Sequence, residues 1–400
     1  MYNSQKYNIN NKILLNKEYF FMKLNVAVIF GHMSCEHDIS IITACQLMRN
    51  LDSFRYNIIP IYITKDNKYI TSPKLANISN FPDNVVGDEV TFSPNSTYLY
   101  KKSIFGLIRH KRIDVAVLCM HGRLGEDGAM QGLFEMNGIP YTSTSIIGSA
   151  CGANKIVFKE ILKGIGIPTA KSMWISDYEY HMRKQKVVAR IIKKLGKKVI
   201  IKPNSLGSSI GISVCEDEIS ITKGLKLAFE LDDRVLVEEY IEDIKEVNIA
   251  TFYTGTEYIF SDIEEAEHKS KFLSFEEKYI NGHKSSRANA VYLGGNTVAD
   301  ITSEQKTRIK MYTKRLYDTL NLKGIVRYDY MISGDRVLLN EINTIPGSLA
   351  NYLFKSKGLS YNKLLDELIN SAIVNNSKSK RYTRTFNSTV LKGNCKGVKK

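Results

Sequence analysis

The most informative stretch of the sequence is a pair of short runs near the C-terminal end, Gly324-Ile-Val-Arg327-Tyr-Asp329-Tyr-Met-Ile332 and Val337-Leu-Leu-Asn-Glu341-Ile-Asn343. Both are apolar and β-branched enough to form strands, and Ser333-Gly334-Asp335 between them has turn composition. A hairpin folded about position 335 places Asp329 opposite Glu341 and Arg327 opposite Asn343. Because side chains alternate along a strand, the four polar groups then share one face. This set suits a divalent cation that bridges phosphate oxygens, although an ion-paired solvent face is the alternative that the hairpin alone leaves open.

The N-terminal third alternates between strands and a helix. Apolar strands are predicted at 24–30, 56–63 and 114–119, and a helix at 36–50. This order predicts an open parallel α/β sheet, whose ligands lie at the carboxyl ends of the strands. Ser34-Cys35-Glu36 and His121-Gly122 would lie at that edge.

The rest of the chain divides into two smaller units. The first has a helix at 154–166 and a strand–loop–strand unit from Lys198 to Val214. The second has strands at 234–241 and 246–253, a long polar stretch at 264–296, a helix at 303–320 and the hairpin. We therefore predict a flexible extension at 1–21, an N-terminal α/β substrate domain at 22–142, a central subdomain at 143–237, a C-terminal subdomain at 238–375 and a basic disordered tail at 376–400.

Composition fits a globular enzyme of two or three domains. The chain has 400 residues, 43% hydrophobic and 24% charged, with a net charge of +15. The basic residues are spread along the chain apart from the tail, which argues against nucleic acid as the main partner. Six scattered cysteines without C-x-x-C spacing indicate reduced thiols in the cytoplasm. No apolar run is long enough to span a membrane, and no membrane partner is expected.

Several segments could bind a nucleotide. Lys202 precedes a loop of small residues, Pro203 to Gly211, whose N–H groups could surround phosphate oxygens, although an empty Gly/Ser hairpin looks the same. Lys155 begins a helix, where anions are favoured, or it lies on the surface. Glu238-Glu-Tyr-Ile241 could place backbone groups against an adenine, with Glu246 at a ribose, although acidic residues after a strand usually face water.

Taken together, these runs resemble the D-alanine–D-alanine ligase family of the ATP-grasp superfamily over about residues 24–373. The stretch from His121 to Tyr141, HGRLGEDGAMQGLFEMNGIPY, is close to a family signature. The resemblance implies a three-domain ATP-grasp fold that uses ATP and two Mg²⁺ ions, with Mn²⁺ as a substitute. It also implies a homodimer and small-molecule substrates, D-alanine and ATP.

The resemblance carries roles onto matching positions. It implies ATP contacts from Lys155, Lys202, Ser209, Glu238, Ile241, Glu246 and Lys278, and metal ligands in Asp329, Glu341 and Asn343. Glu36 would bind the first ammonium and hydrogen-bond with Ser208 and the lid residue Tyr279. His121, Tyr352 and Leu353 would contact substrate, and Arg327 with the Gly347 N–H would stabilise the tetrahedral centre.

The implied reaction passes through an acyl phosphate, which a lid carrying Lys278 and Tyr279 would shield from water. The sequence departs from the family pattern at several positions: His32 replaces a glycine, Asn154 an aspartate and Leu206 a glutamate. Tyr352 stands where the family usually has a serine that contacts the second substrate's carboxylate. Either the Tyr352 hydroxyl or Ser348 could take that serine's place.

Three functions are compatible with these residues. The first is ligation of two D-alanines for peptidoglycan precursors in the cytoplasm, and the second is a related dipeptide ligase with a different second amino acid. The third is a catalytically silent nucleotide-binding regulator, which has no need for Arg327, Asp329, Glu341 and Asn343 together. Polyanion binding by residues 376–400 could accompany any of them.

Overall fold

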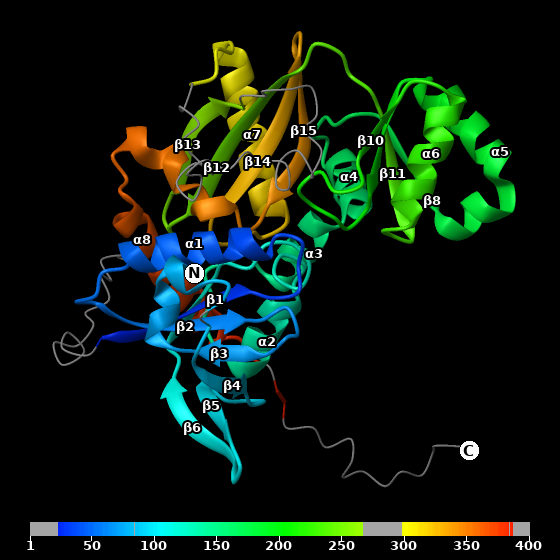
Figure 1. The fold of residues 1–400 in the computed structure, drawn as a ribbon. Coiled ribbons are helices and arrows are strands. Elements are labelled where there is room, and N and C mark those ends of the chain that lie inside the picture. Colours follow the sequence, from blue (N-terminus) through cyan, green and yellow to red (C-terminus); the bar gives the residue numbers. More distant parts are fainter. Residues whose placement is uncertain (1–22, 84, 267–297, 384, 387–400) are drawn as a thin grey trace, which may run out of the picture.

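The computed structural model describes residues 23–83, 85–266, 298–383 and 385–386, which form three sheets with flanking helices (Figure 1). The extension at 1–21, Lys278, Tyr279 and the end of the tail from residue 387 lie outside the described residues. The five cysteines of the described part are free, in agreement with the prediction. Within that part no helix is long and apolar enough to cross a membrane.

The first sheet has seven strands in the order β6-β5-β4-β3-β2-β1-β7. β1 pairs in parallel with β2 and β7, whereas β3 to β6 continue the sheet as antiparallel strands. The buried runs of β1 and β7 explain the parallel part, because parallel strands are covered on both faces. The elements are β1 (Leu24–Gly31), α1 (His37–Asn50), β2 (Tyr56–Ile63), β3 (Tyr69–Thr71), η2 (Pro73–Ala76), η3 (Ile78–Asn80), β4 (Asp88–Phe92), β5 (Tyr98–Ser103), β6 (Gly106–Arg112), β7 (Val115–Leu118) and α2 (Ala129–Asn137).

The second sheet is antiparallel, with four strands in the order β10-β9-β11-β8. Helices α5 and α6 pack on one face of it and share its core, and this unit projects to one side of the molecule (Figure 1). The elements are α3 (Ile146–Ala153), α4 (Lys155–Gly164), β8 (Ser172–Ser176), α5 (Asp177–Leu195), β9 (Val199–Pro203), β10 (Ser213–Cys215), α6 (Glu218–Phe229) and β11 (Arg234–Glu239).

The third sheet, in the order β13-β12-β14-β15, contains the predicted hairpin. Asp329 pairs with Glu341 and Arg327 with Asn343, as predicted. The turn itself is the two-residue Gly334-Asp335, and a bulge at Asn340 then restores the pairing about position 335. The elements are β12 (Lys245–Tyr253), β13 (Tyr258–Glu265), α7 (Ser303–Thr319), β14 (Val326–Ser333), β15 (Arg336–Asn343), η6 (Gly347–Lys357) and α8 (Tyr361–Ser379).

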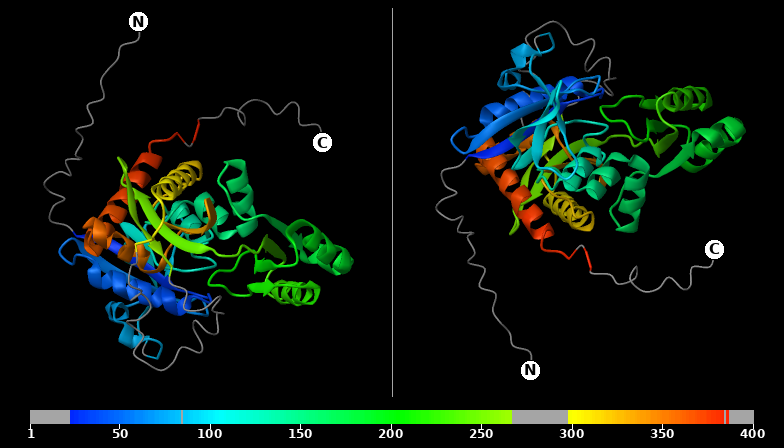
Figure 2. Two further views of the ribbon diagram at one scale, coloured as in Figure 1. Left: turned by 90° about the horizontal axis from the view of Figure 1, so that it is seen from above. Right: turned by 90° about the horizontal axis from the view of Figure 1, so that it is seen from below.

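The packing units differ from the predicted boundaries in four places. The predicted boundary at 237/238 cuts β11, which belongs to the second sheet. Phe158 and Leu162 of α4 pack into the core of the third sheet rather than the second. The C-terminal elements η6 and α8 complete the core of the first sheet, and Figure 2 shows α8 (orange to red) alongside that sheet (blue). α8 also continues to Ser379, so residues 376–379 of the predicted disordered tail are helical.

Candidate active site

The polar face of the β14–β15 hairpin is organised around Asp329. Burial alternates strictly along β14, so that Arg327 and Asp329 lie on the half-buried face while Tyr328 and Tyr330 face the core. The Arg327 guanidinium donates to both carboxylate oxygens of Asp329, at 2.8 and 2.9 Å, and Asn343 Nδ2 donates to Oδ2 at 3.0 Å. Asp329 is therefore held in one orientation by donors from two strands.

The predicted metal ligands occupy neighbouring positions across the hairpin. Glu341 pairs with Asp329, and Asn343 lies two residues further along the same face. Carboxylate and amide oxygens are the ligands that Mg²⁺ prefers, so this donor set fits the predicted ion. In the described residues no group of three or more His, Cys, Asp or Glu side chains converges on one point. A site here would therefore rely on the amide and on oxygens of the nucleotide.

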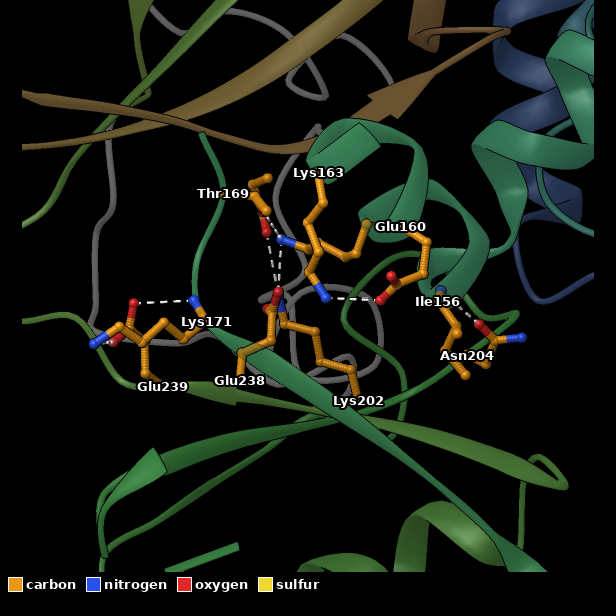
Figure 3. A network of polar contacts seen from close by, with 11 residues as sticks. Ile156, Glu160, Lys163, Thr169, Lys171, Lys202, Asn204, Glu238 and Glu239 are labelled. Carbon is orange, nitrogen blue, oxygen red and sulfur yellow. Dashed lines mark hydrogen bonds and ion pairs between the residues drawn. The ribbon is translucent and has the colours of Figure 1, made fainter. Parts of the chain in front are cut away.

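Glu238 lies buried between two lysines. Its Oε2 is 2.5 Å from Lys202 Nζ and its Oε1 is 2.6 Å from Lys159 Nζ, which also donates to Thr169 Oγ1 at 2.6 Å (Figure 3). Burial alone would raise the pKa of Glu238, but the two ammonium groups outweigh it and lower the pKa to about 2. Glu238, which we predicted beside an adenine, thus anchors Lys202, which we predicted to contact a phosphate.

The sequence analysis missed Lys159, although a signal for it exists. The apolar stripe of α4 runs through Ile156 and Leu162, and Lys159 lies midway between them at helical spacing, with 2% of its surface exposed. A lysine at a core position indicates a buried anionic partner, because an unpaired buried charge is strongly unfavourable. Here that partner is Glu238.

The other predicted phosphate lysine, Lys155, is tied to the loop after β9. Its Nζ donates to the carbonyl of Leu206 at 2.5 Å, and Asn204 Oδ1 accepts from the N–H of Ile156 at 3.0 Å. Burial lowers the pKa of Lys155. Burial also acts to lower the pKa of Lys202, but Glu238, Glu341 and Glu246 together raise it above its ordinary value. The charges of Glu246 and Glu341 on the third sheet therefore act on Lys202 of the second sheet.

The first predicted substrate residue, Glu36, meets the same loop. Ser208 Oγ donates to Glu36 Oε1, which joins the N-cap of α1 to the loop between β9 and β10 across 172 positions of sequence. Gly122 has φ of +80°, which favours glycine, and a Cβ added there would lie 2.8 Å from Ser34 Oγ and 3.0 Å from Glu36 Oε2. Burial raises the pKa of Glu36, while the hydrogen bond from Ser208 opposes that shift. The predicted third member, Tyr279, lies outside the described residues.

The predicted substrate residue His121 connects the first sheet to the turn after β15. Its Nε2 lies 3.0 Å from Thr43 Oγ1, which also accepts from the N–H of Ser348 at 3.3 Å. Burial lowers the pKa of His121 to about 4, so the ring is neutral near pH 7. Glu126 makes a parallel link by accepting from the N–H groups of Gly122 at 2.8 Å and Ile345 at 3.2 Å. Burial, followed by the charge of Glu36, raises the pKa of Glu126 to about 8.

The segment after Pro346-Gly347 places Tyr352 and Ser348, the two candidates for the role of the family's serine, in different surroundings. Tyr352 and Leu353 are buried in the core of the first sheet. Ser348 instead begins a run of three non-glycine residues with φ near +50°, and its hydroxyl donates to Gln46 Oε1 at 2.5 Å. Left-handed backbone is unfavourable for such residues, and Ser348 and its neighbours are held in it by contacts with α1.

The remaining predicted residues are spread over several elements. Gly347 is the first residue of η6, and Ser209 lies in the β9–β10 loop with φ of +61°. Glu246 lies on β12 beside β14, and Ile241 follows β11. Besides Lys159 and Glu126, the sequence analysis missed the bulge residue Asn340, whose Oδ1 accepts from Lys202 at 3.3 Å. The site thus draws on all three sheets.

Known proteins are similar to this chain over most of its length. A family model described as D-ala D-ala ligase N-terminus matches residues 25–144, and another described as D-ala D-ala ligase C-terminus matches residues 161–370. A D-alanine--D-alanine ligase of Thermosipho melanesiensis is 35% identical over 357 residues, which cover 88% of this chain and 94% of that relative.

Solved structures give the same fold. The D-alanine-D-alanine ligase from Coxiella burnetii has a TM-score of 0.74 and 26% identity, covering 90% of this chain and 96% of its own. The VanG D-Ala:D-Ser ligase from Enterococcus faecalis has a TM-score of 0.72 and 27% identity, covering 88% and 100%. The similar structures therefore include one named as a D-alanine-D-alanine ligase and one named as a D-Ala:D-Ser ligase.

Proposed function

The chain belongs to the D-alanine–D-alanine ligase family, and we propose from this premise that it joins two D-alanine molecules with conversion of ATP to ADP and phosphate. The observation that carries the proposal is the hydrogen bond between Glu36 and Ser208. It brings a half-buried carboxylate, suited to an ammonium group, to the loop that follows Lys202 and contacts Lys155. An amino acid and a nucleotide phosphate could therefore be held side by side.

In the first step, a carboxylate oxygen of the first D-alanine attacks the γ-phosphorus of ATP, and the bond to ADP breaks. Glu36 would hold the ammonium of this D-alanine, while Lys155 and Lys202 would hold phosphate oxygens. Glu238 fixes Lys202 through a 2.5 Å ion pair, so that its charge need not reorganise during the transfer. Ser209, Ile241 and Glu246 complete the proposed nucleotide contacts.

Asp329, Glu341 and Asn343 would hold two Mg²⁺ ions, or Mn²⁺ in their place. When bound, these ions neutralise charge on the transferring phosphoryl group. The support is the donor set of the hairpin face, in which Arg327 and Asn343 already orient Asp329.

In the second step, the amine of the second D-alanine attacks the acyl phosphate, an amide forms and phosphate leaves. Arg327 and the N–H of Gly347 would stabilise the oxyanion of the tetrahedral centre. His121, neutral near pH 7, would lie near the first carboxylate. Lys278 and Tyr279 would act from a lid, as the family resemblance implies.

We propose Ser348, rather than Tyr352, as the group that meets the carboxylate of the second amino acid. Both residues are buried, but Tyr352 packs among the apolar side chains of the first sheet, whereas the backbone N–H of Ser348 is linked through Thr43 to His121. Because this position differs from the family pattern, a second candidate is a dipeptide ligase with another second amino acid. D-serine is the natural first alternative, since a D-Ala:D-Ser ligase is among the similar structures.

A cytoplasmic location, where ATP is available, and a homodimeric state are parts of the same proposal and rest on family resemblance. The test is release of ADP and phosphate by the purified protein with Mg-ATP and D-alanine alone, with parallel reactions that add D-serine, D-lactate or L-amino acids. Turnover with D-alanine alone, with the dipeptide identified by its mass, would support the main proposal. Turnover only with a mixed pair would favour the second candidate, and no turnover with any pair would overturn both.

A further inference from the structure

The β5–β6 hairpin ends in an uncovered apolar tip. We define the hairpin tip as Ile104, Phe105, Leu107 and Ile108, whose exposed fractions are 94%, 89%, 53% and 51%. β6 is the edge strand of the first sheet, and all but one of its residues are exposed. Figure 1 shows the β5–β6 hairpin projecting from the first sheet, away from α1 and the third sheet. Exposed apolar residues gathered at the end of a projection indicate a contact surface.

A collar of cations lies directly behind the tip. In the hairpin register, Lys102 is opposite Leu107, Lys101 is opposite Ile108, and Arg109 and Lys111 follow on β6. Residues 90–113 contain five Lys or Arg and no Asp or Glu. Lys101 and Lys102 pair with carboxylates of β4, but Arg109 and Lys111 have no carboxylate partner in the part of the chain that the structure describes. The collar therefore keeps a positive charge.

The positive charge of the collar favours an anionic partner over a second copy of this chain. A second copy paired antiparallel along the edge strand about Arg109 would place Arg109 against Arg109, and one paired about His110 would place Arg109 against Lys111. Like charges directly opposite one another on paired strands are destabilising. A partner surface must instead be anionic at the collar and apolar beyond it. A bilayer with anionic headgroups has this layered chemistry.

We propose that the hairpin tip docks this protein onto an anionic lipid surface, with the tip in the headgroup–acyl boundary and the collar on the phosphates. At about 3.3 Å per residue, Phe105 at the end of the tip lies ~10 Å beyond Ile108, which is opposite Lys101 of the collar, and this matches the depth that interfacial segments reach. The contact is peripheral and crosses no membrane. It does not depend on the ligase proposal, because the hairpin contributes no residue to the candidate active site.

The test is co-sedimentation of the full chain with vesicles. One set contains equal parts of phosphatidylcholine and phosphatidylglycerol, and the other contains phosphatidylcholine alone. The tip variant is Ile104→Asp with Phe105→Asp. The matched control is Phe54→Asp with Met136→Asp, which changes the net charge equally at two apolar residues that are 86% and 75% exposed elsewhere. We expect salt-sensitive binding to anionic vesicles that falls at least about tenfold in the tip variant and little in the control.

A second readout separates the tip from the basic tail. The chain has one tryptophan, Trp174, so Phe105→Trp in a Trp174→Phe background reports on the tip alone. Its emission should shift to the blue with anionic vesicles and be quenched by brominated lipid. Equal vesicle binding by tip variant and control, or an unshifted emission, would overturn the proposal. A tip variant that changes the sedimentation of the protein without vesicles, but not its binding to vesicles, would also overturn the proposal. The tip would then be a self-association surface.

Discussion

Replacement of Glu238 by Gln removes one negative charge from between two buried ammonium groups while keeping the shape of the side chain. Glu238 is 1% exposed, and its pKa is lowered from an ordinary 4.5 to about 2 by Lys159 and Lys202, against the opposing effect of burial. At about 1.4 kcal/mol per pH unit, this shift corresponds to roughly 3 kcal/mol of stability at neutral pH. Loss of one partner from a buried ion pair is expected to cost a similar ~3–5 kcal/mol.

The pH dependence has a definite sign. Because folding depresses the pKa of Glu238, its contribution is present above about pH 4.5 and is lost as the pH falls toward 2. The variant lacks this contribution at every pH. The difference in unfolding free energy between wild type and Glu238→Gln should therefore be equal at pH 7 and pH 5 and shrink at more acidic pH.

The chain's one tryptophan reports on the correct sheet. Trp174 on β8 pairs with Leu236 on β11, two residues from Glu238. Urea unfolding followed by its fluorescence therefore measures the unit that contains the ion cluster. The matched control is Glu239→Gln, because Glu239 is the next residue on β11 and its ion pair with the exposed ammonium of Lys171 is long, at 3.9 Å. Glu239 also accepts from the N–H of Lys171 at 3.0 Å, and the glutamine oxygen can still accept that hydrogen bond.

We expect about 3 kcal/mol of destabilisation for Glu238→Gln at pH 7 and less than about 1 kcal/mol for Glu239→Gln. Equal unfolding free energies for the two variants would refute the reasoning. A difference between wild type and Glu238→Gln that stays constant down to pH 3 would refute the assigned pKa.

Three further predictions concern the hairpin, the second substrate and a domain contact. Arg327→Ala should lower kcat by ~100-fold or more with little change in the KM for ATP, and Arg327→Lys should restore part of the lost kcat. A kcat of the alanine variant equal to that of the wild type would reject the role of Arg327 at the tetrahedral centre. Ser348→Ala should raise the KM for the second amino acid more than Tyr352→Phe does, and the reverse order in initial-rate kinetics would restore the tyrosine as the carboxylate ligand. Gly324→Ala should lower the free energy of unfolding by more than about 2 kcal/mol, because its Cβ would lie 1.9 Å from the carbonyl oxygen of Thr142. Gly334→Ala, with open space around it, should cost only about 1 kcal/mol. Similar melting temperatures for the two variants would contradict the close contact at Gly324.

The hairpin shows what a sequence pattern can predict. Alternation and turn composition placed Asp329 opposite Glu341 correctly. A two-residue turn at Gly334-Asp335 alone would shift that pairing by one residue, and the bulge at Asn340 corrects it. The bulge residue Asn340 accepts from Lys202 of another sheet, a contact that the local sequence does not indicate.

Contacts between distant segments were predicted only through family resemblance. Glu36 and Ser208 are each ordinary polar residues locally, and nothing in either stretch indicates the other. Glu126 was quoted within a signature stretch, but its bonds to Gly122 and Ile345 depend on how the first and third sheets meet. The predicted domain boundaries failed for the same reason, because continuous numbering cannot show that α8 returns to the first sheet.

That return affects how the chain emerges from the ribosome. The core of the first sheet includes Val26 and Leu118 but also Phe354 and Ala372, which are made last. At synthesis rates of ~5–20 residues per second, more than about ten seconds separate Leu118 from Ala372. During that interval the first sheet exists without its final covering helix. We therefore expect the nascent chain to rely on chaperones until translation ends, and truncation before α8 to leave an aggregation-prone product.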